Sequence, residues 1–428
     1  MARSDAGAGA ADRSPQASGR SAESAHHLRS SVDLPLTLRE GAPVRRNQGR
    51  GDALASRHSS PSSSRFCLAD RPVTAVPKIG ILTFHRCINY GSYWQARALV
   101  EGLRGRGHDA VLLDHHCEQV NRVEWRCAFQ PLLPQRSARS DFPFYKEKAR
   151  KIIDAVDRLP RSSRFSLHAP GEMDRYDLVV VGSDEVWNMR HPWYGGKPIF
   201  YGAGIEAGRL ASYAASFGNH DASEGLDQAW AEKLRRFSAI SVRDDNSRSL
   251  VREALGVEPA LVLDPCLQFP PVTPEPEQER ERPYVALYGH NFPDWYGDAV
   301  RAWADARGYR IVSVGYRSPY ADEQAIDAGP DEFSRLIGRA AAVATNFFHG
   351  CVFALLHNRP FAAVSSAYRS NKVRDLMRTV GAEPHLTTMP GDASRIGDLL
   401  GTPLDPGIGD RIAALRRQSD TYLAHALA

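Results

Sequence analysis

Cysteine is scarce in this sequence, with six residues in 428, at positions 67, 87, 117, 127, 266 and 351. No two of them form a C-x-x-C pair, so neither a zinc ribbon nor a disulfide framework is indicated. Scattered single thiols in a long chain are typical of a reducing compartment, and we expect a cytoplasmic protein. His, Cys, Asp and Glu do not recur at metal-ligand spacing, so the sequence predicts no metal site.

Long hydrophobic runs are also missing. The longest candidate, residues 340–356, is interrupted by Thr345, Asn346, His349 and Gly350 and falls short of a membrane span. The N-terminus lacks the apolar core of a secretory signal. We therefore expect at most peripheral contact with a membrane, at its inner face.

The excess of positive charge is small and unevenly placed. The chain holds 54 Lys and Arg against 50 Asp and Glu, a formal net charge of +4. Residues 1–76 contain 11 of the basic and 7 of the acidic residues, so the remaining 43 of each sign balance. A neutral folded part has no overall field to attract a polyanion, which argues against nucleic acid as a partner. Residues 1–76 lack hydrophobic periodicity and are predicted to be a disordered tail.

Strands and helices alternate along the rest of the chain. KIGILTF at 78–84 and DAVLLD at 109–114 are apolar strands that flank a helix-like run over 92–105, which indicates a β-α-β unit and a parallel sheet. A helix is also predicted over 146–159. Further strands are predicted at 177–182, 209–215, 239–243 and 260–263. Their continuous apolar character is typical of a sheet covered on both faces.

A second alternation follows a Pro- and Glu-rich segment at 270–283, which we interpret as a linker. Strands are predicted at 284–288, 310–314, 341–345 and 361–364, and helices at 295–307, 330–339 and 350–357. The prediction is two α/β domains, 77–269 and 284–409, followed by a C-terminal helix over 410–428. Ligands usually bind in the cleft that two such domains form.

The first domain carries two polar segments directly after strands. Asn89 and Gly91 indicate a tight turn, with Ser92 as the N-cap of a helix whose free N–H groups favour an anion. Ser183 and Asp184 can hold sugar hydroxyls, and Trp187 offers a flat apolar face. The alternatives are an ordinary turn in the first segment and a helix cap in the second.

Cations follow other strand ends. Arg243 ends an apolar strand and can clamp a carboxylate or phosphate; the alternative is an ion pair with Asp244 or Asp245. In the second domain the candidates are His349 with Gly350, and Arg369 with Lys372. Taken together, these residues predict a positively lined cleft for a small anion. The chain has no G-x-G-x-x-G, P-loop or G-x-S-x-G motif.

At this point the chain resembles the polysaccharide pyruvyl transferase family. The matching segments span about 300 residues in order: KIGILTFHR…NYGSYWQARAL at 78–99, VVVGSDEVWN at 179–188, SYAASFG at 212–218, FSAISVRDD at 237–245, LVLDP at 261–265, NFFHGCVFALLHNRPF at 346–361 and NKVRDLM at 371–377. The resemblance implies a GT-B-like fold with two Rossmann-like domains. It also implies transfer of pyruvate from phosphoenolpyruvate to sugar hydroxyls, with formation of a ketal and release of phosphate.

The resemblance also implies roles for single residues. Arg243 and His349 are the expected catalytic residues, with His349 as the general acid or as a stabiliser of the phosphate. The donor site comprises Arg243, His349, Lys372, Asn89, Gly91 and Gly350. The acceptor site comprises Ser183, Asp184, Trp187 and Gln95. No cofactor is expected beyond the donor substrate, and the sugar acceptor is linked to a lipid or a nucleotide.

The chain departs from the family pattern at Tyr93 and Trp94, where a small residue and Leu are usual, at Glu185, where Gln is usual, and at Asn346, where Asp is frequent. The bulky pair at 93–94 is expected to reshape the acceptor side. Two alternative functions stay open. One is a nucleotide-sugar glycosyltransferase of the same architecture, and the other is a diverged non-catalytic protein of glycan assembly.

Overall fold

The computed structural model describes residues 76–271, 282–365 and 370–428. Most of the predicted tail at 1–76, most of the predicted linker at 270–283, and Arg369 lie outside the described residues. Pro72–Ala428 form one compact unit.

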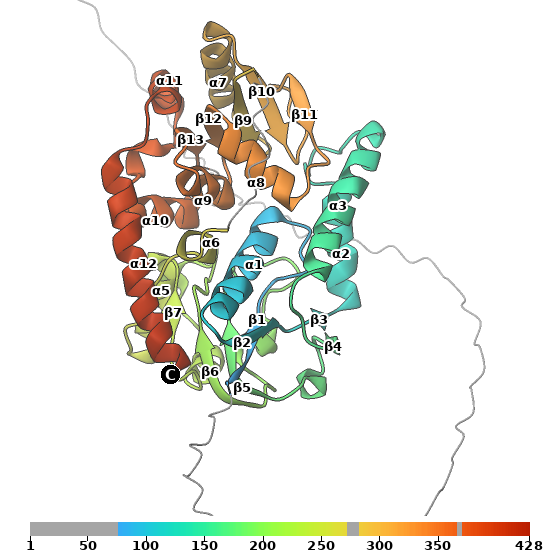
Figure 1. Cartoon of the computed structure of the whole chain (residues 1–428), viewed down its shortest axis with the longest axis vertical. Coiled ribbons are helices and arrows are strands. Elements are labelled where there is room, and N and C mark those ends of the chain that lie inside the picture. The colour runs from blue at the N-terminus through green and yellow to red at the C-terminus, as the bar shows by residue number, and fades with distance from the viewer. Residues whose placement is uncertain (1–75, 272–281, 366–369) are drawn as a thin grey trace, which may run out of the picture. The chain divides into compact units, whose positions relative to one another are not determined.

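A parallel sheet forms the base of the first half (Figure 1). Its strands, in spatial order, are β2 (Asp109–Leu112), β1 (Lys78–Leu82), β5 (Tyr176–Val181) and β6 (Ala207–Ser212). Each neighbouring pair is parallel, for example Ile79 beside Ala110 and Leu178. The central strands are buried almost along their whole length, which explains their unbroken apolar sequences.

Helices cover this sheet and extend from it. They are α1 (Tyr90–Gly105), α2 (Glu118–Phe129), α3 (Phe142–Asp157), α4 (Gln228–Leu234), α5 (Asp245–Leu255) and α6 (Pro265–Gln268). Two short parallel pairs complete the half: β3 (His115–His116) with β4 (Phe165–Ser166), and β7 (Ser241–Val242) with β8 (Ala260–Leu261). An isolated bridge between Ala215 and Val242 links β7 to the chain beyond β6.

The second half is built on a wider sheet, again parallel between all neighbours. Its order is β11 (Glu323–Ala325), β10 (Arg310–Val314), β9 (Tyr284–Tyr288), β12 (Ala342–Thr345), β13 (Phe361–Val364) and β14 (Leu386–Thr387). The helices are α7 (Asp294–Ala306), α8 (Pro330–Arg339), α9 (Phe348–Leu356), α10 (Ser370–Val380), α11 (Ala393–Gly401) and α12 (Pro406–Leu427). Short 3-10 helices occur at Arg139–Asp141, Pro170–Glu172, Pro198–Tyr201, Ala222–Glu224, Glu383–His385 and Pro390–Asp392.

The two halves share a hydrophobic core. One cluster of buried side chains joins Leu99 of α1 to Phe333 of α8 and Phe353 of α9. Trp94 of α1 donates its indole N–H to the carbonyl of Pro330 at the start of α8. The halves are therefore packed together rather than joined by the chain alone.

Helix α12 returns from the second half to the first, along the left side of Figure 1. Near its end the hydroxyl of Tyr422 donates to the carbonyl of Ser212 at the end of β6, and Ser419 accepts from the backbone of Leu263. Helix formation at the C-terminus was predicted over 410–428, and the observed helix begins four residues earlier, at Pro406.

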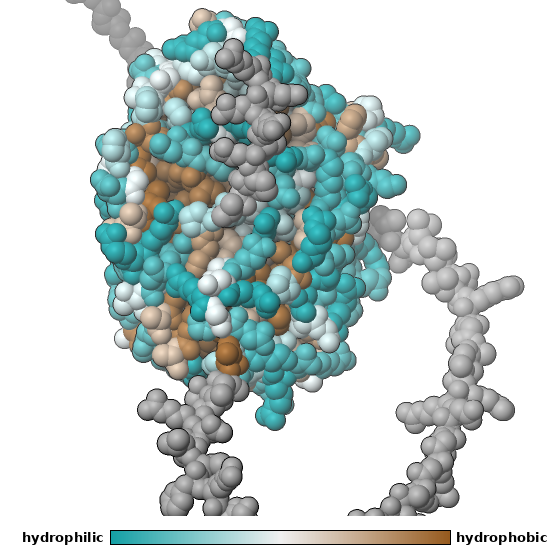
Figure 2. All heavy atoms as spheres, viewed as in Figure 1, coloured by the Kyte–Doolittle hydropathy of each residue, from teal (hydrophilic) through white to brown (hydrophobic). Residues whose placement is uncertain are grey.

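The expected α/β class with parallel sheets is confirmed. The surface in Figure 2 is mainly hydrophilic, with smaller hydrophobic areas. Each helix within residues 76–271, 282–365 and 370–428 is too short or too polar to pass through a lipid bilayer. Because all strands of a parallel sheet end at one edge, the loops after them gather in space, and the candidate site lies there.

Candidate functional site

A cavity of about 400 Å³ lies where the loops after the strands of both halves meet. From the first half it is lined by Asn89, Asp184 and Arg243, and from the second half by His349 and Lys372. Sequence positions almost 300 residues apart thus border one space. The structure brings these five predicted site residues together.

Arg243 directly follows β7, and its side chain is only 2% exposed. One terminal nitrogen, Nη1, donates to the Asp264 carboxylate and to the Gln95 side chain, each at 3.1 Å. The other, Nη2, lies 3.5 Å from an oxygen of Asp184, and the guanidinium stacks over Phe348. Burial alone would lower the pKa of Arg243, but the carboxylates around it raise this pKa.

The expected alternative partners of Arg243 were Asp244 or Asp245, and that expectation is wrong. Asp244 instead caps α5, where it accepts from the backbone of Ser247 at 2.7 Å. Arg243 instead forms ion pairs with Asp184 and Asp264, which are distant in the sequence. These two carboxylates compensate for the burial of the guanidinium.

Gln95 and Ser183 lie behind Arg243. Both are fully buried and neither lines the cavity. The Ser183 hydroxyl donates to the Gln95 carbonyl oxygen at 2.9 Å, and the same oxygen accepts from Arg243. Their positions support orientation of Arg243 rather than the expected contact with an acceptor.

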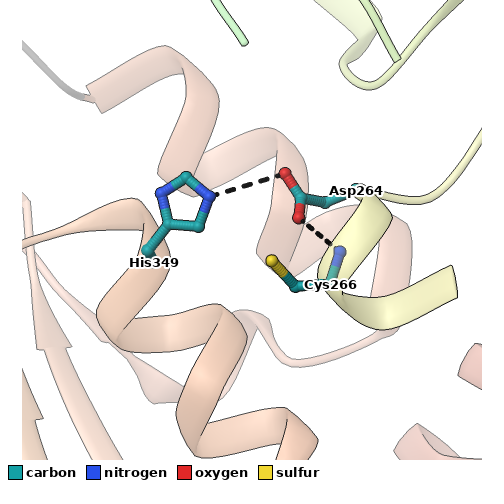
Figure 3. Close-up of side chains that lie close together, drawn as sticks. All are labelled: Asp264, Cys266 and His349. Carbon is teal, nitrogen blue, oxygen red and sulfur yellow. Dashed lines mark hydrogen bonds and ion pairs between the residues drawn. The ribbon is translucent and has the colours of Figure 1, made fainter. Parts of the chain in front are cut away.

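His349 is the second residue of α9, and its ring faces Asp264 of the first half (Figure 3). The distance from His349 Nε2 to the nearer Asp264 oxygen is 3.6 Å. The other Asp264 oxygen accepts from the backbone N–H of Cys266, as the N-cap of α6. Burial would raise the pKa of Asp264, but His349 and Arg243 lower it to about 2. Asp264 is therefore a permanent carboxylate beside the imidazole.

Asp264, Cys266 and His349 are residue types that bind metals, and one ligand atom of each lies within 4.8 Å of the others. The sequence could not indicate this cluster, because His349 comes from the other half. The Asp264 oxygen nearest His349 already accepts from Arg243. Burial raises the pKa of the Cys266 thiol well above its usual range, so the thiol stays protonated. This donor set favours a carboxylate shared by Arg243 and His349 over a cation site.

Gly91 lies directly against His349. A Cβ at this position would overlap the imidazole ring, with Nδ1 as the nearest atom. The turn before Gly91 is fixed by Asn89, whose side chain accepts from the backbone of Gly91 at 2.7 Å and of Ser92 at 3.3 Å. Asn89 is therefore the N-cap of α1, and the expectation that Ser92 caps it is wrong.

Gly350 does not line the cavity. A side chain there would overlap Thr345 at the end of β12, so glycine is needed for the turn from strand to helix. Packing against Thr345 is therefore the reason for a glycine at position 350, and the expected contact of Gly350 with the donor is not supported.

Lys372 projects from α10, and its amine forms an ion pair with Glu185. Burial would raise the pKa of Glu185, but Lys372 lowers it to about 2. Both residues line the cavity. The sequence predicted a cleft lined by positive charge. In the structure the cations of the cleft are paired with carboxylates, so its lining carries both signs of charge.

The polar segment after β5 contributes one residue to the cavity and another to the hydrophobic core. Asp184 lines the cavity and accepts from the Ser92 hydroxyl at 2.8 Å. Trp187 is fully buried, and its N–H donates to the carbonyl of Phe200. The position of Trp187 does not support the expected sugar contact.

Tyr93 and Trp94 also point into the core. Trp94 packs against Phe353, and Tyr93 lies beside Arg97. Neither residue lines the cavity, so their size serves the contact between halves. The expectation that they reshape the acceptor side is not supported by their positions.

Sequence reasoning missed several residues that line the cavity. Glu124 of α2 and Lys148 of α3 reach it from the stretch between the second and third predicted strands, and Trp193 reaches it from the loop after β5. Lys148 donates to the carbonyl of Gly315 at 2.8 Å, and burial lowers its pKa to about 7. The only sequence signal was a Glu and a Lys on the apolar side of amphipathic helices.

The family model for polysaccharide pyruvyl transferases matches residues 89–368. A search of curated proteins finds no match. Among solved structures, the chain is 13% identical to a glycotransferase of kitacinnamycin, with 81% of this chain and 95% of that chain covered and a TM-score of 0.41. It is 13% identical to the UDP-GlcNAc 2-epimerase from Methanocaldococcus jannaschii, with 77% and 93% covered and a TM-score of 0.42. It is 14% identical to the ADP-heptose LPS heptosyltransferase II from E. coli, with 80% of this chain and 99% of that chain covered and a TM-score of 0.33.

Proposed function

Because this chain belongs to the polysaccharide pyruvyl transferase family, we propose that it transfers pyruvate from phosphoenolpyruvate to two hydroxyls of a sugar, forming a ketal and releasing phosphate. The observation that carries the proposal is the convergence of Arg243, Lys372 and His349 on one cavity. The donor has a carboxylate and a phosphate, and two cations with one proton donor match that pattern.

The two cations bind the anionic groups of the donor. The guanidinium of Arg243 can form two parallel hydrogen bonds with a carboxylate or phosphate, whereas the amine of Lys372 acts as a point charge. The donor shares these cations with Asp184 and Glu185, with which Arg243 and Lys372 form ion pairs. Buried Asp264 holds the guanidinium in place meanwhile.

Helix N-termini add to the attraction of an anion. Asn89 before α1, Phe348 at the start of α9 and Lys372 near the start of α10 all line the cavity. The free N–H groups and the positive end of the dipole at each N-terminus favour negative charge.

His349 is the general acid in this proposal. It gives a proton to the methylene carbon of the donor, which becomes a methyl group and leaves a cationic centre at C2. Asp264, a carboxylate 3.6 Å from Nε2, orients the imidazole for this step. Each sugar hydroxyl then attacks C2, and phosphate departs with the electrons of its bond to C2.

The acceptor in this proposal is a glycan or a glycan precursor on a lipid or nucleotide carrier. We place the reaction in the cytoplasm, where the free thiols, including Cys87 and Cys351, remain reduced.

Calorimetric titration with phosphoenolpyruvate tests the donor site. We expect phosphoenolpyruvate to bind to the wild-type protein. Binding to Arg243→Lys should be at least about tenfold weaker, because this variant keeps the positive charge but loses the two parallel hydrogen bonds of the guanidinium. Binding to Lys372→Met should also be weaker. Arg248→Ala, which changes a partly exposed arginine on the following helix, is the matched control and should bind as the wild type does. Unchanged affinity in Arg243→Lys would contradict the assignment, as would binding of a nucleoside diphosphate sugar in place of phosphoenolpyruvate.

His349→Ala separates chemistry from binding. We expect the donor affinity to change little and phosphate release to fall about 10²–10⁴-fold, the usual contribution of a general acid. Full turnover of this variant would remove His349 from the mechanism.

A further inference from the structure

Within the part of the chain that the structure describes, one carboxylate that lines the cavity forms no ion pair with a cation. Asp184 and Glu185 are paired with Arg243 and Lys372. Glu124 also lines the cavity, and among residues 76–271, 282–365 and 370–428 no Lys, Arg or His forms an ion pair with it. A carboxylate that is not held by a cation is available to accept a proton.

Neutral donors hold the Glu124 carboxylate in place. The indole N–H of Trp193 donates to Oε1 at 2.7 Å, and the backbone N–H of Ile88 donates to Oε2 at 3.3 Å. The side chain also contacts the Cys87 thiol, and the residue is 8% exposed. These contacts come from two separate segments of the chain, the loop after β1 and the loop after β5, so the carboxylate has a fixed direction.

Burial makes this carboxylate a stronger base. It raises the pKa of Glu124 above its usual range, and the hydrogen bonds from Cys87, Trp193 and Ile88 oppose that rise only in part. General bases in enzymes are tuned in this direction.

Trp193 supplies an aromatic surface beside the carboxylate. Its N–H is used by Glu124, and its ring packs edge-to-face with His191 at a centroid distance of 4.9 Å. The indole is half-buried and lines the same cavity. A fixed aromatic ring next to a carboxylate suits a sugar, which offers an apolar ring face and polar hydroxyls.

We propose that Glu124 and Trp193 form the acceptor subsite, with Glu124 as the general base that deprotonates the attacking sugar hydroxyls. This proposal rests on the proposed function and replaces Ser183, Trp187 and Gln95 as acceptor residues. The acceptor class it names is a sugar with two hydroxyls close enough to close one ketal ring.

The proton balance of the reaction closes with this base. In each attack the O–H bond breaks, its proton passes to Glu124, and its electron pair forms the bond to C2 of the pyruvyl group. Two protons are released in this way. One equals the proton that His349 gave to the methylene carbon, and the other leaves on the phosphate.

Glu124→Gln tests the base directly. We expect its affinity for phosphoenolpyruvate, measured by calorimetry, to stay within about twofold of the wild type, while kcat for phosphate release falls at least about 100-fold. Glu118→Gln is the matched control, because Glu118 lies on the same helix and is exposed in an ion pair with Arg122. It should show wild-type turnover.

The pH profile separates a base from a structural carboxylate. As the pH falls through the pKa of Glu124, the base is protonated and kcat of the wild type should fall; this limb should be absent in Glu124→Gln. The other titratable groups facing Glu124 are Cys87, Cys127, Tyr194 and Asp184. The thiols and the phenol have raised pKa values and stay neutral in this range, and Asp184 is paired with Arg243.

Trp193→Phe gives a second, graded readout. It removes the N–H that lowers the pKa of Glu124 but keeps an aromatic ring, so the acid limb should move to higher pH.

Wild-type kcat and pH profile in Glu124→Gln would overturn the proposal, and so would a loss of donor affinity as large as the loss of kcat. A wild-type protein that binds no phosphoenolpyruvate and releases no phosphate contradicts the proposed function itself, and this proposal falls with it.

Discussion

The side chain of Gly91 is a single hydrogen atom, and the ring of His349 occupies the space that any larger side chain would need. This contact joins the first helix of one half to the proposed general acid on the other. At the residue scale, the position of the imidazole thus depends on a residue that takes no part in the chemistry.

Gly91→Ala should displace His349 without unfolding the protein, because the imidazole lies at a cavity and can rotate away. We expect phosphate release to fall about 100-fold, since an error of about 1 Å in a catalytic group has an effect of that size. The control is Gly105→Ala in the same helix, where an added Cβ meets no atom within 4 Å. An active Gly91→Ala variant would show that the imidazole need not be where the structure has it.

Lys148 predicts a dependence of stability on pH. Its pKa is lowered to about 7 by burial, against an ordinary value of 10.5. Between these values the unfolded chain binds more protons than the folded one, so this group makes the free energy of unfolding rise with pH above about 7. In urea unfolding between about pH 7 and pH 9, Lys148→Met should show a smaller rise than the wild type.

Lys146→Met is the control for this measurement, because Lys146 is exposed on the same helix. It should keep the wild-type slope. If Lys148→Met also kept that slope, the buried amine would not be the titrating group.

At the scale of elements, α2 and α3 form an arm that carries Glu124 and Lys148 to the cavity. The arm is held to the second half by Arg317, which donates to both oxygens of Asp141 at 2.5 and 2.6 Å, and by Lys151, which pairs with Glu332. Asp141 is 1% exposed, so its carboxylate depends on this partner.

Arg317→Ala should destabilise the protein by about 1–3 kcal/mol, because it leaves a buried carboxylate unpaired. The expected check is urea unfolding, followed by Asp141→Asn in the Arg317→Ala background, which removes the unpaired charge and should recover part of the loss. Arg150→Ala, an exposed arginine of α3, should change stability by less than about 0.5 kcal/mol. Equal effects of the two arginine substitutions would contradict the role of the Asp141 pair.

At the scale of the whole molecule, the sequence predicted the class and the strand-end site, and tertiary contacts decided the rest. Arg243 and His349 could be found because each follows an apolar strand, which is a local signal. Their shared partner Asp264 could not, since the His349 contact joins residues 85 positions apart on different halves. The sequence predicts that Trp187 contacts the acceptor, because the pattern of residues around an aromatic side chain after a strand does not show whether this side chain is buried or exposed.

The shared core predicts cooperative unfolding. Residues Pro72–Ala428 form one compact unit, one hydrophobic cluster draws on both halves, and α12 binds back to β6. Differential scanning calorimetry should therefore show one transition for this unit, with equal calorimetric and van't Hoff enthalpies. Two separated transitions would show that the halves unfold independently.

The central claim is pyruvyl transfer from phosphoenolpyruvate, and its most direct test is a product measurement. The purified full chain is incubated with phosphoenolpyruvate and a panel of lipid-linked and nucleotide-linked sugars, and both free phosphate and the mass of each sugar are followed. We predict phosphate release that requires one of the sugars, with one pyruvate ketal on that sugar for each phosphate, and a decrease of both in Arg243→Lys. Phosphate release without a modified sugar, or sugar transfer from a nucleotide donor, would contradict it.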